Sequence, residues 1–557
     1  MRKTILRLTA AAPLALLLAG CQKEVLQVQN YNAPDVVRVY ATPASIEGVL
    51  SGGYQTVNSS IRGSSEGLGT QSHNMALEMY ASVANFGGNT RAAIPRIAIF
   101  NDRGNSVQTG NQRDFQQLSK TARTAATGVQ ALDRLVTGGG TLGSPAQNTR
   151  ARAFGFFVNG VALGYLSFGY DSSAIVTVMT PSDEVPPLAS YADVNKAALQ
   201  MLDSALAVAQ SADATSGING FPLPSTWLTY AVAQDAFVRL VKSERARIRA
   251  GVARTPAERA AVDWNAVIAD ATAGISADFK LAINPTTGWS CSFDCSQMEV
   301  SAGWGQISPM YYGMTDTSGF YARWIATPIG QRDGAGMFIT PDKRWPQGAT
   351  RAAQTADSPL PLPPGKYFRN KPLGEDVAGD SFGTSNYIHS RWWFIRNNSG
   401  IGDYVHMSRT EMDMLAAEGY IRTGNLAAAT ALINTSRTRN GMPAIAVPAS
   451  ATVAISPQVA GGFTSQGCVP QVPQPPAFST VGCGSILEAM KYEKRMETAF
   501  AGYMQWFNDS RGWGDLVEGT ALQWPVPNVE MDARVQPFYN LGGLGGPSSA
   551  AKGTYGF

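Results

Sequence analysis

Apolar positions recur with a helical period along the first half of the chain. In the stretch 114–136 the apolar and small side chains fall on one helical face, and three glycines at 138–140 end the pattern. The predicted helices follow one another in pairs, joined by short turns that contain Gly or Pro. This pairing indicates tetratricopeptide-like hairpins, although the consensus residues of that repeat are absent. Similar patterns predict further helices at 145–168, 191–209, 225–241 and 256–276.

The pattern changes between residues 280 and 400, where Gly, Pro, Ser, Thr and aromatic residues dominate and no long amphipathic period continues. Helical periodicity returns at 409–439, as two helices joined at a Gly-Asn turn, and again at 484–507. We therefore predict a mostly α fold in a single domain. Its expected parts are a helical scaffold at about 41–278 and 405–520, a loop-rich aromatic region at about 280–400, and irregular chain beyond 524.

The N-terminus has the pattern of a bacterial lipoprotein signal peptide at residues 1–20. Basic residues precede a short apolar stretch, and Leu-Ala-Gly then leads to Cys21, which resembles a lipobox whose cysteine is lipidated. A soluble secreted protein with a chance cysteine is the alternative. Several acyl chains on Cys21, at about 0.8 kcal/mol per buried CH₂, would anchor the protein firmly. Residues 21–40 are then predicted to form a polar, lipidated tether. The Gln-Lys-Glu after Cys21 resembles a surface-export signal of Bacteroidetes lipoproteins.

Composition excludes several classes of protein. The 557 residues are 44% hydrophobic, too many for a mostly disordered chain, and no run of 18 apolar residues lies beyond the N-terminus. The formal charge of +3 is not a property of the mature chain, because Arg2, Lys3 and Arg7 lie in the signal peptide. Without these three of the 44 basic residues, 41 remain against 41 acidic residues. A chain near zero net charge is a poor nucleic-acid binder, so no nucleic-acid partner is expected.

The remaining cysteines predict two disulfide bonds. An even number of cysteines in an exported protein favours local pairs. Zinc binding is the alternative, but none of the three histidines falls at ligand spacing to a cysteine, so no metal is expected. The expected bonds are Cys291–Cys295 and Cys468–Cys483.

Motifs for catalysis are weak. The glycine-rich segment 138–143 has GxGxxG spacing, but a predicted helix precedes it where a dinucleotide fold needs a strand, so we interpret it as an inter-helix loop. Three histidines and no GxSxG make a nucleophile–base triad improbable. Glu493 and Glu497 lie four residues apart, as a glycosidase pair would, but the basic neighbours favour a solvated or ion-paired face.

Aromatic residues of the loop-rich region are candidate ligand platforms. Six of the eleven tryptophans fall within 289–393, where a uniform distribution would place about two. An indole or phenol ring packs well on the apolar C–H face of a pyranose, while polar neighbours bind its hydroxyls. A core role is the alternative for each ring taken singly. The candidates are Trp289, Trp304, Tyr311, Tyr312, Tyr321 and Trp324.

The last helical segments resemble the SusD/RagB family of outer-membrane nutrient-binding lipoproteins. Residues 409–419 are similar to that family's R-x-x-E-x-x-L-x-x-A-E-A helix, and residues 424–441 to its G…A-x-x-x-I-N-x-x-R-x-R-x-G segment. Residues 492–502 resemble its ER-x-x-E-x-x-x-E-G helix, with Ala501 for the usual Glu and Tyr503 for the usual Arg. Weaker similarity continues at 509–514 and 524–527.

The resemblance implies a scaffold of four tetratricopeptide-like hairpins in one SusD-like domain at 41–557, carrying an irregular glycan-binding region. It also implies a lid over a TonB-dependent SusC-like transporter, to which a surface lipoprotein of the outer membrane hands an oligosaccharide or similar nutrient. No catalytic step and no cofactor are expected, whereas an exported all-helical glycan-active hydrolase and a lid for peptides are the alternatives. Motif residues expected to tie helices together as ion pairs are Glu411, Glu418, Arg437, Glu493, Arg495 and Glu497.

Overall fold

The computed structural model describes residues 39–62, 67–81, 87–104, 108–211, 220–297, 306–332, 334, 336–371, 385–456 and 467–557. The predicted signal peptide, Cys21 and all but the last two residues of the predicted tether lie outside these ranges, as does Trp304. Within the ranges described, no helix is both long enough and apolar enough to cross a membrane.

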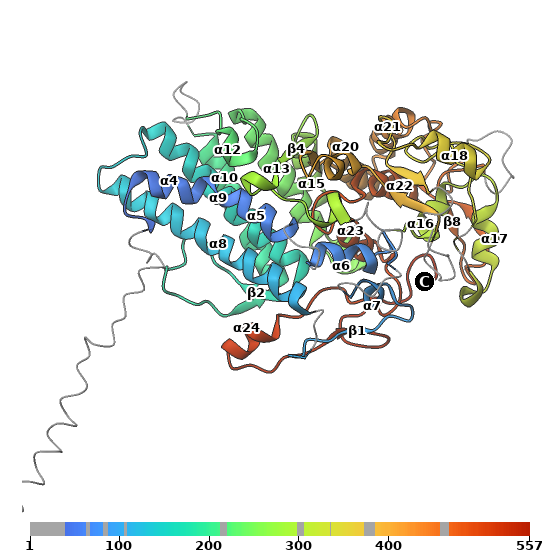
Figure 1. Ribbon diagram of the computed structural model, residues 1–557, viewed down its shortest axis with the longest axis horizontal. Helices are drawn as coiled ribbons and strands as arrows, with labels where there is room; N and C mark the ends of the chain where they lie inside the picture. The colour runs from blue at the N-terminus through green and yellow to red at the C-terminus, as the bar shows by residue number, and fades with distance from the viewer. Residues whose placement is uncertain are drawn as a thin grey trace, which may run out of the picture.

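The first half of the chain forms a bundle of helices at one end of the elongated molecule (Figure 1). The helix α9 is buried over almost its whole length and packs against both α8 and α10. Glycines on α9 permit this close approach, because a Cβ atom at Gly164 would lie 2.4 Å from the side chain of Ile248. The helices of the bundle are α4 (Pro43–Ser51), α5 (Gly53–Arg62), α8 (Gln108–Thr137), α9 (Pro145–Gly169), α10 (Tyr191–Ala209) and α13 (Gln234–Gly251).

The glycine-rich segment 138–143 is the loop between α8 and α9, as predicted. Gly139 has a φ of 81°, in the left-handed region that glycine adopts without strain. Ser144 then caps α9, because its hydroxyl accepts a hydrogen bond from the main-chain N–H of Gln147. A helix on each side of the segment is inconsistent with the strand–loop–helix geometry of a dinucleotide site.

The helix predicted at 225–241 is wrong in its extent. The short helix α12 (Ser225–Leu228) ends at Thr229, whose φ of 67° is incompatible with a continuing right-handed helix. An antiparallel bridge between Leu223 and Val232 then turns the chain before α13 begins. This bridge pairs residues across the turn, which the apolar period alone does not encode.

Two further predicted helices are also divided. Within 256–276 the chain breaks before Asp263, whose carboxylate caps the following helix by accepting a hydrogen bond from the N–H of Ala266. Within 484–507 the helix ends before Phe500 and Met504, which have φ values of 51° and 57°. The resulting helices are α14 (Pro256–Ala260), α15 (Trp264–Thr272), α22 (Ile486–Thr498) and α23 (Gln505–Trp513).

The second part of the scaffold is the predicted hairpin at 409–439, formed by α20 (Arg409–Arg422) and α21 (Leu426–Arg439). Gly424 makes the turn with a φ of 85°, and the side chain of Asn425 caps α21. The helix α20 packs against α15, α21 and α22, so it joins the two parts of the scaffold.

The strands are short and occur as two-stranded antiparallel pairs. The pair β4–β7 encloses the loop-rich region, because Ile283 at the end of β4 lies opposite Gly402 at the start of β7. The predicted boundaries of that region, about 280 and 400, therefore coincide with a ladder. The pairs are β1 (Ala98–Ile99) with β10 (Leu541–Gly542), β2 (Ser172–Ala174) with β3 (Leu188–Ser190), β4 (Phe279–Ile283) with β7 (Gly402–Met407), β5 (Phe368–Asn370) with β6 (Tyr387–His389), and β8 (Gln471–Pro473) with β9 (Val481–Cys483).

Much of the loop-rich region lies at the other end of the molecule, beside α21 and α22 (Figure 1), whereas its first loop packs against α5 of the bundle. The chain beyond 524 is mostly irregular, as predicted, although it contains the short helix α24 (Asn528–Ala533) and returns to β1 through β10. The short helices of the loop-rich region are α16 (Pro309–Tyr312), α17 (Phe320–Ala326), α18 (Arg351–Asp357) and α19 (Trp393–Asn397).

Both disulfide bonds have the predicted local pairing. Cys291 is bonded to Cys295, and Cys468 to Cys483. The second bond closes the hairpin β8–β9 at its base, since Cys483 is the last residue of β9 and lies opposite Gln471 of β8.

The predicted scaffold carboxylates are buried in ion pairs that join distant helices. Glu411 on α20 accepts a 2.6 Å bond from Arg247 on α13, and Glu418 accepts one of 2.6 Å from Arg259 on α14. Glu493 and Glu497 on α22 share Arg344, at 3.0 and 3.1 Å. The basic motif residues are also buried among polar partners. Arg495 forms an ion pair with Asp515. Arg437 donates to the carbonyl of Val469 at 2.7 Å and lies 3.9 Å from Glu493.

Candidate functional site

The aromatic residues predicted to bind ligand are mostly core residues, so the expected open platform is wrong for this structure. Tyr312 is fully buried and lies 4.7 Å from the ring centre of Phe338 and 5.1 Å from that of Tyr387. Tyr311 contacts Trp506 edge-on at 5.5 Å, beneath the guanidinium of Arg495. The exposed fractions, none above 5%, are those of Trp289, Tyr311, Tyr312, Tyr321 and Trp324.

A polar partner fixes each of the last two rings in the core. Tyr321 donates a hydrogen bond to the carbonyl of Met310 at 2.9 Å. Trp324 lies parallel to Tyr321 and carries the guanidinium of Arg332 4.7 Å from its ring centre. Large rings fill the space between short, irregular segments that present no continuous apolar helix face, which explains why tryptophan is concentrated here.

Trp289 differs from the other rings because it lines an open cavity of about 430 Å³, which we call the polar groove. The groove lies between α5, α12, β4 and the loop that follows β4, and it is of the size typical of small-ligand sites. Of its described lining residues none is charged. Its polar side chains are Gln55, Ser225, Thr226, Thr229, Asn284 and Thr287.

The loop 284–289 gives the groove its shape. Asn284 and Trp289 form an antiparallel bridge, with main-chain bonds of 2.8 and 3.2 Å between them. Gly288 closes the loop with a φ of 83°, and the side chain of Gln55 donates a 2.6 Å bond to the carbonyl of Thr287. These bonds fix the main chain of Trp289, whose side chain lines the groove.

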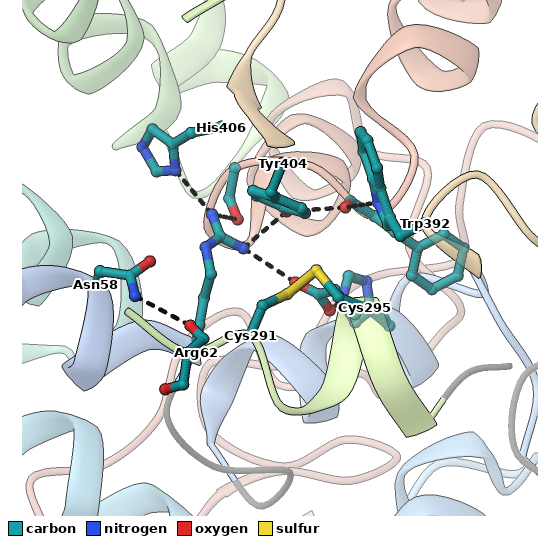
Figure 2. The surroundings of a disulfide bond; sticks show 12 residues. Asn58, Arg62, Cys291, Cys295, Trp392, Tyr404 and His406 are labelled. Atoms are coloured by element: carbon teal, nitrogen blue, oxygen red, sulfur yellow. Dashed lines mark hydrogen bonds and ion pairs between the residues drawn. A yellow bond between two sulfur atoms is a disulfide. The ribbon is translucent and has the colours of Figure 1, made fainter. Parts of the chain in front are cut away.

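Helix α5 anchors the chain that continues from Trp289 to the first disulfide bond. Asn58 donates to the carbonyl of Ser290 at 3.0 Å, and the carbonyl of Arg62 accepts from Ser292 at 3.0 Å. Figure 2 shows Arg62 beside the disulfide Cys291–Cys295, with its guanidinium directed toward His406 on one side and Tyr404 on the other, each 2.7 Å away.

A buried charge network continues from Arg62. Its guanidinium also forms a 3.0 Å ion pair with Asp294, which lies between the two cysteines of the disulfide. His73 bonds to both Asp294 and Glu78, and although burial opposes its charge, these carboxylates raise the pKa of His73 to about 10. The chain that follows the groove loop is therefore held by a buried network of charges.

An exposed ring that the helical period did not reveal lies next to the groove in the chain. Tyr230 follows Thr229 of the groove and is 43% exposed, while its hydroxyl donates to the carboxylate of Asp403. The sequence pattern assigned Tyr230 to a continuous helix, and the left-handed turn at Thr229 instead leaves its ring in solvent.

The described residues contain neither an exposed carboxylate pair at 493 and 497 nor a cluster of metal ligands. Glu493 and Glu497 are at most 2% exposed and are held by Arg344, so the ion-paired alternative is confirmed and the solvated one is wrong. The surrounding cations lower the pKa of Glu497 to about 2 despite its burial, whereas burial raises the pKa of Glu493. Among the residues described, no group of three or more His, Cys, Asp or Glu side chains is placed to hold a metal ion.

These features define the class of protein: a scaffold of helical hairpins that carries a loop-rich region and an uncharged polar groove. A SusD superfamily protein from Bacteroides vulgatus has the same fold, with a TM-score of 0.52, 13% sequence identity, and coverage of 86% of this chain and 89% of that chain. The chain therefore has a mostly α, SusD-like fold, as predicted.

Other solved structures are similar at a lower score. A SusD superfamily protein from Bacteroides thetaiotaomicron has a TM-score of 0.49 and 13% identity, over 89% of this chain and 97% of that chain. A SusD-like carbohydrate binding protein from Bacteroides vulgatus has a TM-score of 0.47 and 13% identity, over 83% and 82%. No family model and no curated protein matches the sequence.

Proposed function

We propose that this protein is a lipoprotein of the SusD/RagB family that captures an oligosaccharide at the cell surface and hands it to a SusC-like TonB-dependent transporter. The SusD-like fold and the family-like motifs of α20, α21 and α22 support the family. The observation that carries the binding function is the polar groove, which Trp289 lines together with hydroxyl and amide side chains.

The chemistry of the groove matches a neutral sugar. Hydroxyl and amide groups both donate and accept hydrogen bonds, as the hydroxyls of a pyranose require. The indole of Trp289 supplies apolar surface for the C–H face of the sugar ring. An uncharged lining gives no preference for an ion, so we propose a neutral oligosaccharide as the ligand of this groove.

Binding by the groove is tested with one exposed threonine inside it and one outside it. Thr226→Val removes a hydroxyl of the groove and keeps the shape of the side chain, whereas Thr435→Val makes the same change on the exposed surface of α21. A hydrogen bond contributes about 0.5–1.5 kcal/mol, so Thr226→Val should weaken glycan binding roughly 2- to 10-fold. Calorimetry with the strongest ligand from a glycan and peptide array measures both variants.

Trp289→Ala provides the second variant for the groove. Loss of one stacking ring costs about 1–3 kcal/mol for nucleic-acid bases, and sugars should lie toward the lower end, so affinity should fall roughly 5- to 30-fold. Equal affinities of wild type, Thr226→Val and Trp289→Ala would reject the groove as the site. A ligand found only among the peptides would reject the sugar.

Absence of a catalytic step is also part of the proposal. The paired carboxylates Glu493 and Glu497 are bound by Arg344 and line none of the cavities described above, which supports a binder over a hydrolase. Incubation with the glycan that binds should therefore release no reducing ends. Release by the wild-type protein would reject this part of the proposal, and a Glu493→Gln variant would then show whether the buried pair is responsible.

The anchor and the partner are tested in cells. Cys21→Ser should move the protein out of the outer-membrane fraction, since the lipidated residue is lost. Wild-type protein should co-purify with a SusC-like transporter after mild detergent extraction. Unchanged fractionation of Cys21→Ser would reject the anchor, and purification without any transporter would reject the hand-off.

A further inference from the structure

A second cavity, of about 550 Å³, lies between the disulfide-closed hairpin, the C-terminal segment 549–554 and the ends of two scaffold helices. It shares no described lining residue with the polar groove. One wall is apolar and includes Phe478, Leu516 and Leu522. Three basic residues also line this cavity, namely Arg254, Arg511 and Lys552. We call it the arginine cavity.

The two arginines are buried against the C-terminal ends of helices. Arg254, 2% exposed, donates to the carbonyls of Phe168 at 2.6 Å and Ser167 at 2.5 Å, near the end of α9. Arg511, 1% exposed, donates to Phe168 at 2.8 Å and to Gly251, the last residue of α13, at 3.0 Å. Their acceptors are neutral carbonyls, and those of α9 and α13 lie at the negative ends of helix dipoles. Arg511 also donates to the carbonyl of Leu522 at 2.9 Å.

Arg247, Arg259 and Arg344, which are also buried, each form an ion pair with a carboxylate. Arg91 and Arg96 are buried without such a pair among the residues described, as Arg254 and Arg511 are, but they line neither of the two cavities. In the part of the chain that the structure describes, no carboxylate lies within ion-pair distance of Arg254 or Arg511. A nearby carboxylate, that of Glu258, is engaged by the main-chain N–H of Arg254 and by a tyrosine hydroxyl.

Their positive charge is therefore incompletely compensated. Burial lowers the pKa of Arg254 to about 10 and that of Arg511 below its usual range, because little negative charge offsets the loss of water. The Nε–H of Arg254 is buried and has no hydrogen-bond partner. A buried, uncompensated cation at an open cavity is an arrangement that an anionic ligand stabilises.

We propose that the arginine cavity binds a small organic carboxylate, with its carboxylate toward Arg254 and Arg511 and its apolar body against Phe478, Leu516 and Leu522. The cavity has the volume of a small-molecule site, and basic side chains beside apolar ones fit an amphipathic anion better than a neutral sugar. The disulfide Cys468–Cys483 contributes to the site, because Phe478 lies in the hairpin that this bond closes. This second site is independent of the function proposed for the polar groove.

The charge requirement is tested with matched pairs of ligands. Benzoate and benzyl alcohol share a ring, and glucuronate and glucose share a pyranose, but only the first member of each pair carries a carboxylate. Calorimetry at low ionic strength should show at least one carboxylate binding about tenfold or more tightly than its neutral partner, because only the anion compensates the arginines. The pair that responds identifies the source as an aromatic acid or an acidic sugar.

The location is tested with variants that leave both arginines in place, since these residues also cap helices. Ala550→Trp should fill the cavity, and Lys552→Glu should repel an anion at its wall, so each should weaken carboxylate binding about tenfold. Lys120→Glu, on the exposed surface of α8, is the control and should bind as wild type does. The proposal is overturned if neither carboxylate binds in the millimolar range, if neutral partners bind as tightly, or if Ala550→Trp and Lys552→Glu bind unchanged.

Discussion

Replacing Arg259 with methionine removes one member of a fully buried ion pair and leaves its partner in place. Arg259 on α14 donates two hydrogen bonds to Glu418 on α20, of 3.0 and 2.6 Å, and both side chains are completely buried. Methionine keeps most of the apolar volume of the arginine stem. The variant therefore leaves Glu418 in the core without its main counter-ion. It also removes the 3.1 Å pair of Arg259 with Asp509, which keeps Lys494 as its partner.

The structure gives the magnitude in two ways. Despite desolvation, the cation of Arg259 and its hydrogen bonds lower the pKa of Glu418 from 4.5 to about 2. Since each pKa unit corresponds to about 1.4 kcal/mol, this shift is worth about 3 kcal/mol of folding free energy. Removing one member of a buried pair typically costs about 3–5 kcal/mol. Arg422 and Trp513 still donate to Glu418, so we expect about 3 kcal/mol.

Urea unfolding followed by tryptophan fluorescence at pH 7 measures the loss. Arg103→Met is the matched control, because Arg103 pairs with Asp532 at the surface, where the two side chains are 70% and 38% exposed. The control should lose less than about 1 kcal/mol. The double variant Arg259→Met with Glu418→Met should recover part of the loss, because no buried charge is then left without its counter-ion.

The same pair predicts a pH dependence. A carboxylate with a lowered folded-state pKa stabilises the protein above its unfolded value, and this contribution disappears as the pH falls from 4.5 toward 2. Arg259→Met should lose less stability over that interval than wild type does. A loss no larger than that of Arg103→Met at pH 7, or an identical acid dependence, would show that this ion pair does not stabilise the scaffold.

Two other features give independent predictions. His389 is fully buried, and among the described residues neither ring nitrogen has a hydrogen-bond partner. Burial lowers its pKa well below 6.5, so as the pH falls the imidazole is protonated in the unfolded chain before it is protonated in the folded protein. The free energy of unfolding should therefore fall as the pH drops below 6.5. His389→Phe should reduce that fall between pH 7 and pH 5 in urea unfolding, and an unchanged fall would contradict the assignment. Non-reducing peptide mapping should pair Cys291 with Cys295 and Cys468 with Cys483, and crossed pairs would contradict the structure. Replacing the second pair with serine should cost at most about 3 kcal/mol of chain entropy and increase proteolysis of that hairpin alone; global unfolding would show that the bond holds more than a loop.

Local signals in the sequence predicted much of the scaffold. The helices at 145–168 and 191–209 agree with α9 and α10 almost to the residue, because each has a cap and a continuous apolar period. The helix predicted at 225–241 failed, because Thr229 turns left-handed under a contact between Leu223 and Val232 that a helical period does not encode.

The aromatic candidates show that the sequence does not distinguish a core ring from a ligand-binding ring. Composition identified an unusual concentration of rings, but the same indole or phenol serves a core or a binding surface. Burial depends on what packs against a ring from elsewhere in the chain: Tyr311 is covered by Trp506 of α23 and Tyr312 by Phe338. Trp289 alone of the rings described lines the polar groove.

The sequence by itself thus determined the helical hairpins, the local disulfide pairs and the family-like motifs, all of which depend on residues close together in the chain. Only the tertiary structure decided where the cavities lie. The polar groove brings Gln55 of α5 to Thr287, 232 residues later, and the arginine cavity brings Arg254 to Arg511. Such sites depend on which helix ends and loops pack together, and this packing is set by the burial of the whole core, which no local pattern of residues records.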